Sequence, residues 1–172
     1  MASAAVAAQA GPKNGLAACP LIQYPEYLSM TFKRGAVIVT NGSGYAIEAT
    51  SPNPTNIIGI ADAPGQNLSA SGTPNSAAPG NVIGTTATIP AIPSMTFEMN
   101  LDDHTSTGHT LAQTDLNVAY GLYKDATTGI WYVDYASTGA SARVVVTGFR
   151  DAVGTACGRV YCQFKSGTTV FA

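Results

Sequence analysis

Carboxylates and imidazoles gather in one short stretch of the chain, at Asp102, Asp103, His104 and His109. Such groups at close spacing can ligate a divalent metal ion. They include both histidines of the chain, so acid–base chemistry near neutral pH would centre on this stretch. However, the stretch is rich in Ser, Thr and Gly, and the sequence contains no second cluster that would complete a coordination shell. We therefore expect a solvated loop here, with a metal-dependent hydrolase as the alternative.

Motifs for nucleophilic catalysis or phosphate binding are absent from the sequence. There is no Gly-x-Ser-x-Gly elbow, and Gly42-Ser43-Gly44 is too short and belongs to a turn. The stretch 11–15 contains two glycines but has neither the spacing of a phosphate-binding loop nor a following helix. We expect a non-enzymatic protein without catalytic residues, bound metal or cofactor.

The composition favours a protein that makes permanent contacts. Charged residues make up 10% of the 172-residue chain, well below the roughly 25% of typical soluble domains. Few long charged side chains mean a smaller entropic cost of ordering them in a lasting interface. The net charge of −2 provides no attraction to nucleic acid. The sequence therefore disfavours nucleic-acid binding and suits a protein packed against other proteins, although a secreted β protein would share this composition.

The cysteines and the N-terminal residues bear on the cellular compartment. Cys19, Cys157 and Cys162 cannot all pair within one chain, and the last two have the spacing of neither a redox nor a zinc motif. We expect buried or incidental free thiols. The Ala-rich first ten residues lack the basic start of a signal peptide, and no stretch approaches the roughly 18 apolar residues needed to cross a membrane. We expect a cytoplasmic product without membrane association.

The clearest structural pattern lies at Phe32–Ala61. The apolar runs 35–40 and 45–50 flank Asn41-Gly42-Ser43-Gly44, and Asn-Gly tolerates the positive φ values of a tight hairpin. The run 57–61 is expected to pair with this hairpin. The following segment, 62–80, is rich in Gly, Pro and Ser and poor in large apolar residues, which predicts a long surface loop.

Strand patterns continue toward the C-terminus. Further strands are expected at 81–89, 95–99, 118–123, 130–135, 142–150, 159–164 and 168–171. In the segment 159–164, Val160, Cys162 and Phe164 should face one way and the alternate residues the other. Because Gly and Pro recur every few residues, no helix longer than about two turns is expected. The sequence predicts an all-β protein, a short-stranded sandwich or barrel.

Three regions are predicted: an N-terminal arm over 1–30, a β lobe over 31–94 and a second β region over 95–172. Whether the two β regions share one core stays open. The arm combines Pro20 and Pro25, which resist regular pairing, with large apolar residues that favour burial. It is expected either to extend across a neighbouring subunit or to pack on its own domain. The candidate partner-binding residues are Leu21, Ile22, Tyr24, Tyr27, Leu28, Phe32 and Trp131.

Aromatic residues concentrate on the predicted hairpin 118–135, at Tyr120, Tyr123, Trp131, Tyr132 and Tyr135. Core packing with cross-strand pairs is the simplest interpretation. A binding face is the alternative, either for a sugar stacked on Trp131 or for a partner subunit, because Tyr and Trp are favoured in interfaces.

The segment Phe32–Ala61 resembles the head-decoration, or cement, proteins of tailed bacteriophages. The likeness consists of the opening F-x-x-G-A-V-I-V, the Gly-rich turn before Y-A-I-E-A, the return N-I-I-G-I-A and, after a Gly/Ala-rich loop, V-I-G-T. It covers roughly residues 30 to 90, and it is a pattern of strands and turns rather than of reactive residues.

This resemblance implies a virion structural protein that is made in the host cytoplasm and sits on the outer capsid surface. Its partner would be the major capsid protein, whose neighbouring subunits it would cement, and it would be a homo-oligomer, commonly a trimer. The family has no catalytic residues to carry over. A carbohydrate- or surface-binding β-sandwich module is the alternative function.

Overall fold

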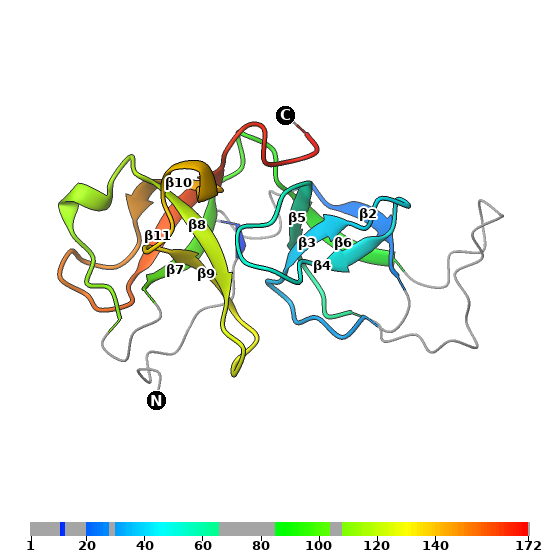
Figure 1. Ribbon diagram of the computed structural model, residues 1–172, viewed down its shortest axis with the longest axis horizontal. Helices are drawn as coiled ribbons and strands as arrows, with labels where there is room; N and C mark the ends of the chain where they lie inside the picture. The colour runs from blue at the N-terminus through cyan, green and yellow to red at the C-terminus, as the bar shows by residue number, and fades with distance from the viewer. Residues whose placement is uncertain (1–10, 13–19, 28–29, 66–84, 104–107, 172) are drawn as a thin grey trace.

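The computed structural model describes residues 11–12, 20–27, 30–65, 85–103 and 108–171, and over these the protein is all-β, as predicted (Figure 1). The strands are β1 (Gly11–Pro12), β2 (Ile22–Pro25), β3 (Val37–Thr40), β4 (Ala46–Glu48), β5 (Ile57–Ala61), β6 (Thr85–Pro90), β7 (Phe97–Asp102), β8 (Ala119–Lys124), β9 (Trp131–Asp134), β10 (Val144–Phe149) and β11 (Arg159–Phe164). Two short 3-10 helices are η2 (Gln113–Asp115) and η3 (Gly139–Ser141). Over the same residues, no helix has the length and apolar character to span a bilayer.

The first lobe is a five-stranded antiparallel sheet in the order β2-β6-β5-β3-β4. Its predicted hairpin is confirmed: β3 pairs with β4, with Val39 opposite Ile47. The turn between them uses Gly42 and Gly44, both at positive φ, which is the backbone conformation that the Asn-Gly signal favours. β5 pairs with β3 as expected. All of its residues are buried, so this strand lies at the centre of the lobe's core.

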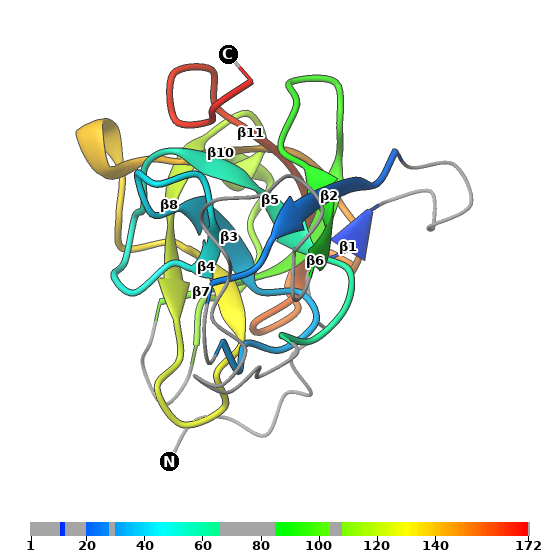
Figure 2. The same cartoon turned by 90° about the vertical axis from the view of Figure 1, so that its right-hand side faces the viewer.

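Residues 20–27 of the predicted arm belong to the first lobe itself. β2 pairs with β6, and Glu26 then forms a bridge with Ala46 of β4. The Tyr27 N–H donates to the Ala46 carbonyl (3.1 Å). The segment 22–27 thus joins β2 and β4, the two outer strands of the curled sheet, and Figure 2 views this lobe from its outer end. Pro25 is tolerated because it ends an outer strand, where one backbone donor can be lost.

The remaining residues of that predicted arm, 1–10, 13–19 and 28–29, lie outside the described residues. So do 66–84, which contain most of the predicted loop 62–80 and the start of the predicted strand 81–89. Where the description resumes, β6 begins at Thr85.

The second lobe is a closed five-stranded barrel. β7, β11, β10, β8 and β9 pair in that order, and a parallel pairing of β7 with β9, with Leu101 opposite Val133, completes the ring. β1 adds to the start of β7. The predicted alternation of β11 is confirmed, since Val160, Cys162 and Phe164 are all buried.

The predicted last strand at 168–171 is wrong. The segment turns instead: Gly167 has positive φ, and the Thr168 N–H donates back to the Lys165 carbonyl (3.2 Å). A single isolated bridge joins Thr169 to Ile57 of the first lobe, and Phe171 packs against the core. The apolar residues at this end of the chain therefore contact the first lobe and do not form a strand of a sheet.

The loop between β4 and β5 connects the two lobes through Asn53. The Asn53 Oδ1 accepts from the Leu122 N–H (2.7 Å), and its own N–H donates to the Leu122 carbonyl (2.9 Å). Asn53 therefore pairs with β8 much as a neighbouring strand would, and it does so at positive φ, which Asn tolerates better than most residues. The Arg143 Nε donates to the carbonyls of Asn53 (2.9 Å) and Pro54 (2.7 Å). The buried apolar residues of both lobes form one contiguous cluster.

Gly121 permits this close approach, and its substitution should weaken the junction. A Cβ at position 121 would lie 2.1 Å from the Asn53 Oδ1 and 2.5 Å from the Ser137 Cβ. We expect Gly121→Ala to lower the free energy of unfolding by about 1–3 kcal/mol, the usual range for overpacking. Gly148→Ala is the matched control, because its Cβ would meet its nearest neighbour, Tyr161, at an ordinary 3.4 Å. Urea unfolding measures both, and equal stability of the two variants would contradict this role for Gly121.

Candidate interaction surface

The structure separates the carboxylates and imidazoles that lie close in the sequence. Asp102 ends β7, and its Oδ1 accepts from the Asp103 N–H (2.7 Å) and lies 3.6 Å from the Cys157 Sγ. The side chain of His109 contacts Asp115 instead. His104 lies outside the described residues. Among the residues that are described, no group of three His, Cys, Asp or Glu side chains is arranged to hold a metal ion.

Asp115, which no sequence motif singles out, is the centre of a buried polar network. Its carboxylate accepts from the His109 Nε2 (2.8 Å), the Tyr120 hydroxyl (2.9 Å) and the Ala112 N–H (2.9 Å). Burial raises the pKa of Asp115, but these hydrogen bonds outweigh it, and the pKa lies below its ordinary value. Burial and the Asp115 carboxylate raise the pKa of Tyr120. The His109 ring also stacks on Tyr135, with centroids 3.6 Å apart. The network fastens the segment before β8 to the barrel.

Replacing Asp115 should destabilise the protein in a pH-dependent way. A carboxylate whose pKa is lower in the folded than in the unfolded state contributes stability above its unfolded pKa, about 4, and loses this contribution as the pH falls through the folded pKa. We expect Asp115→Asn to lower the free energy of unfolding by about 2 kcal/mol at neutral pH. The difference from the wild type should shrink below about pH 4. Urea titrations at several pH values test this, and a difference that stays constant down to pH 3 would contradict it.

The described cysteines have thiols of low reactivity. Cys157 and Cys162 are free and buried, as the sequence predicted, whereas Cys19 lies outside the described residues. Burial raises the pKa of Cys157 to about 11, with Asp102 adding to the shift. Burial alone raises that of Cys162 to about 12. Since the thiolate is the nucleophilic form, neither group reacts readily near neutral pH.

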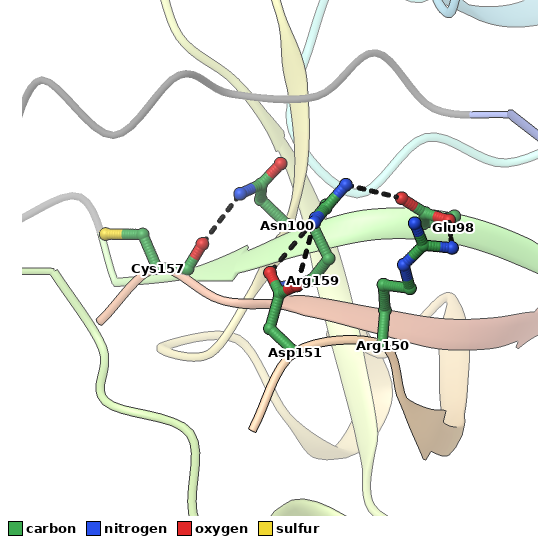
Figure 3. Close-up of polar contacts among 6 residues, drawn as sticks. All are labelled: Glu98, Asn100, Arg150, Asp151, Cys157 and Arg159. Atoms are coloured by element: carbon green, nitrogen blue, oxygen red, sulfur yellow. Dashed lines mark hydrogen bonds and ion pairs between the residues drawn. The ribbon is translucent and has the colours of Figure 1, made fainter. Parts of the chain in front are cut away.

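Charged side chains form an ion-pair network on the outside of the barrel, across the neighbouring strands β7, β11 and β10 (Figure 3). Glu98 lies between Arg159 (3.2 Å) and Arg150 (3.6 Å). Arg159 also pairs with Asp151, through its Nη2 (2.8 Å) and its Nε (3.0 Å). These cations already have carboxylate partners from the same lobe. The network therefore links neighbouring strands at the surface and does not form an anion-binding patch.

The candidate partner-binding residues divide into exposed and buried ones. Leu21 and Tyr27 are exposed, at 45% and 43%, while Ile22 and Tyr24 are half-buried in β2. Leu28 lies outside the described residues.

For the other two candidates the prediction of an accessible binding side chain is wrong. Phe32 is 3% exposed and Trp131 1% exposed. Phe32 is covered by the core of the first lobe. Trp131 is held at the junction between the lobes, where its Nε1 donates to the Glu48 Oε1 (3.0 Å). A sugar could not stack on an indole that has this little exposed surface.

An open groove of about 620 Å³ lies beside β4. It is lined by Tyr27, Met30, Thr31, Phe32, Asn41, Ile47, Glu48, Ala49, Thr50 and Lys124. Half of these are apolar or aromatic, and the lining includes an ion pair between Lys124 and Glu48 (2.7 Å). The groove unites the segment after β2, the β3–β4 hairpin and the end of β8. Tyr27 can be selected from the sequence, because aromatic residues favour interfaces. The groove cannot, because its walls are far apart along the chain.

The groove and the exposed Tyr27 on its rim form the interaction surface that the described residues support best. Comparison with protein family models, with curated proteins and with solved structures found no match.

Proposed function

We propose that this chain is a non-enzymatic virion structural protein that binds the outer surface of a phage capsid and cements neighbouring major capsid subunits. The segment that resembles the phage decoration proteins, Phe32–Ala61, supplies the centre of the first lobe through β3, β4 and β5. The proposal rests on that resemblance together with the low charge of the chain, 10%.

The groove beside β4 is the observation that carries the proposal. Apart from Lys124 of β8, its lining comes from the lobe that carries the resemblance; half of the lining residues are apolar or aromatic, and Tyr27 among them is 43% exposed. Burying apolar area is worth about 25 cal/mol per Å², and Tyr is among the residues that dominate interface energies. On a symmetric shell, many identical contacts of moderate strength add up to firm attachment. Homo-oligomerisation, with a trimer favoured by the resemblance, would multiply them further.

Adding the purified protein to capsids that lack it tests the proposal. We expect the protein to co-sediment with the shells and to raise the temperature at which they rupture. Tyr27→Ala should weaken binding about tenfold or more, as expected for an interface anchor. Val153→Ala is the matched control, because Val153 is also exposed (51%) but lies on the second lobe, beyond β10. Shells that bind no wild-type protein would contradict the proposal.

A further inference from the structure

The side chain of Asn41, directly after β3, is held by the turn that it opens. Its Oδ1 accepts hydrogen bonds from the Ser43 N–H (2.9 Å) and the Tyr45 N–H (3.2 Å). Its own N–H donates to the Tyr45 carbonyl (3.1 Å). Two backbone donors therefore polarise the side-chain carbonyl of Asn41, and they would stabilise negative charge that develops on its oxygen.

The next residue, Gly42, leaves room for a reaction at that carbonyl. It is exposed and has positive φ, and a Cβ built on it would meet nothing within 4 Å. Its nitrogen is placed by the covalent chain to close a five-membered ring on the Asn41 Cγ, and no side chain at position 42 crowds this approach. The other described asparagines precede Pro, Ile, Leu or Val, in that order at Asn53, Asn56, Asn100 and Asn117.

We infer that Asn41 is a self-modification site, at which the chain deamidates through a cyclic imide. The Gly42 nitrogen loses its proton to solvent base and attacks the Asn41 Cγ, which puts negative charge on the Oδ1 between the Ser43 and Tyr45 N–H groups. The carbonyl then reforms, the bond from Cγ to Nδ2 breaks, and ammonia leaves with a proton taken from water.

Water completes the reaction by opening the imide in one of two ways. Breaking the bond between the Asn41 Cγ and the Gly42 nitrogen gives aspartate. Breaking the bond between the main-chain carbonyl carbon of residue 41 and the same nitrogen gives isoaspartate, in which the main chain runs through Cγ. In total, one water is consumed and one ammonia is released, and no other reactant is needed.

The two products change the hairpin differently. Aspartate keeps an acceptor for the two N–H groups and adds a negative charge to the groove, which Asn41 lines. Isoaspartate adds one atom to the main chain, so the residue loses its register with the Tyr45 carbonyl. The end of the ladder, where Thr40 lies opposite Ala46, should then open. Modification at Asn41 therefore alters the charge or the shape of the groove, whether or not the chain binds a capsid.

Ageing the purified full-length protein in mildly alkaline buffer, followed by peptide mass spectrometry, tests the inference. We expect the mass gain of an amide converted to a carboxyl group at Asn41, with Asn53 and Asn117 unchanged. The same protein held in urea gives the rate of the Asn41-Gly42 dipeptide without the hairpin. We expect the folded protein to react at least as fast as the denatured one. A slower reaction in the folded protein, or no reaction at Asn41, would overturn the inference.

A pair of variants at Ser43 tests the part played by the turn. Ser43→Pro removes the N–H that donates to the Asn41 Oδ1, whereas Ser43→Ala keeps it. We expect the proline variant to deamidate about three- to tenfold more slowly than the wild type when folded, the worth of one hydrogen bond. The alanine variant should react like the wild type. Equal rates in both variants would rule out stabilisation by this donor. The comparison of folded and denatured wild-type protein decides the inference even if proline alters the turn.

Discussion

Replacing Trp131 by alanine should lower the free energy of unfolding by about 3–5 kcal/mol, the range for removing a large buried aromatic side chain. Trp131 is 1% exposed, so the change leaves a cavity between the two lobes. It also removes the hydrogen bond to Glu48 (3.0 Å), which leaves one oxygen of that carboxylate with one partner fewer. Urea unfolding followed by circular dichroism measures the loss.

Two control variants test whether the loss of stability in Trp131→Ala comes from the burial of this side chain. Trp131→Phe keeps most of the apolar volume and should lose less stability than the alanine variant. Tyr135→Ala removes an aromatic residue of the same hairpin that is 39% exposed, and it should have a smaller effect still. Wild-type stability of Trp131→Ala, with loss of binding to a glycan, would contradict the burial of this side chain and revive the carbohydrate-binding alternative.

Deleting residues 1–27 should unfold the first lobe. The deletion removes β2 and with it the ladder to β6 and the bridge from Glu26 to Ala46. Glu26 is itself buried and accepts from the Thr86 hydroxyl (2.9 Å). Because this strand joins both edges of a curled sheet, its removal exposes the core of the lobe to water. Each Å² of apolar surface exposed costs about 25 cal/mol of folding free energy.

The shorter deletion of residues 1–19 isolates the contribution of β2, because it leaves that strand intact and removes the short pairing of β1 with β7. We expect this variant to stay folded and the longer deletion to lose the cooperative thermal transition. A cooperative, wild-type-like transition in the longer deletion would show that residues 20–27 are a dispensable arm.

Local signals in the sequence predicted the parts of the fold that local physics decides. The hairpin at Asn41-Gly42-Ser43-Gly44 follows from residues that accept positive φ. The alternation of β11 follows from apolar residues at every second position. Both features involve residues only a few positions apart, so the sequence contains the information directly.

Features that depend on tertiary pairing could not be predicted in this way. The parallel closure of β7 on β9 joins Leu101 to Val133, and no local pattern selects that pair. The sequence predicts a strand at 130–135, but no local pattern indicates that the first lobe covers Trp131. In the sequence, Asn53 looks like an ordinary turn residue. The structure shows that it pairs with β8 at Leu122, just beyond the residues at which β8 pairs with β10.

The candidate site shows the same division. Tyr27 was predicted from its residue type and proves to be exposed on a groove. The groove itself needs Met30, Ile47 and Lys124 from three separate segments. Residue type therefore indicated part of the surface, while the tertiary fold determined its shape.

A map of the mature virion by electron cryomicroscopy tests the proposed capsid binding. We expect density on the outer capsid surface that fits both β lobes, with the β4 groove of the first lobe against a major capsid subunit and a contact to the neighbouring subunit. Particles whose outer surface carries no such density, or that contain this chain in another part of the virion, would contradict it.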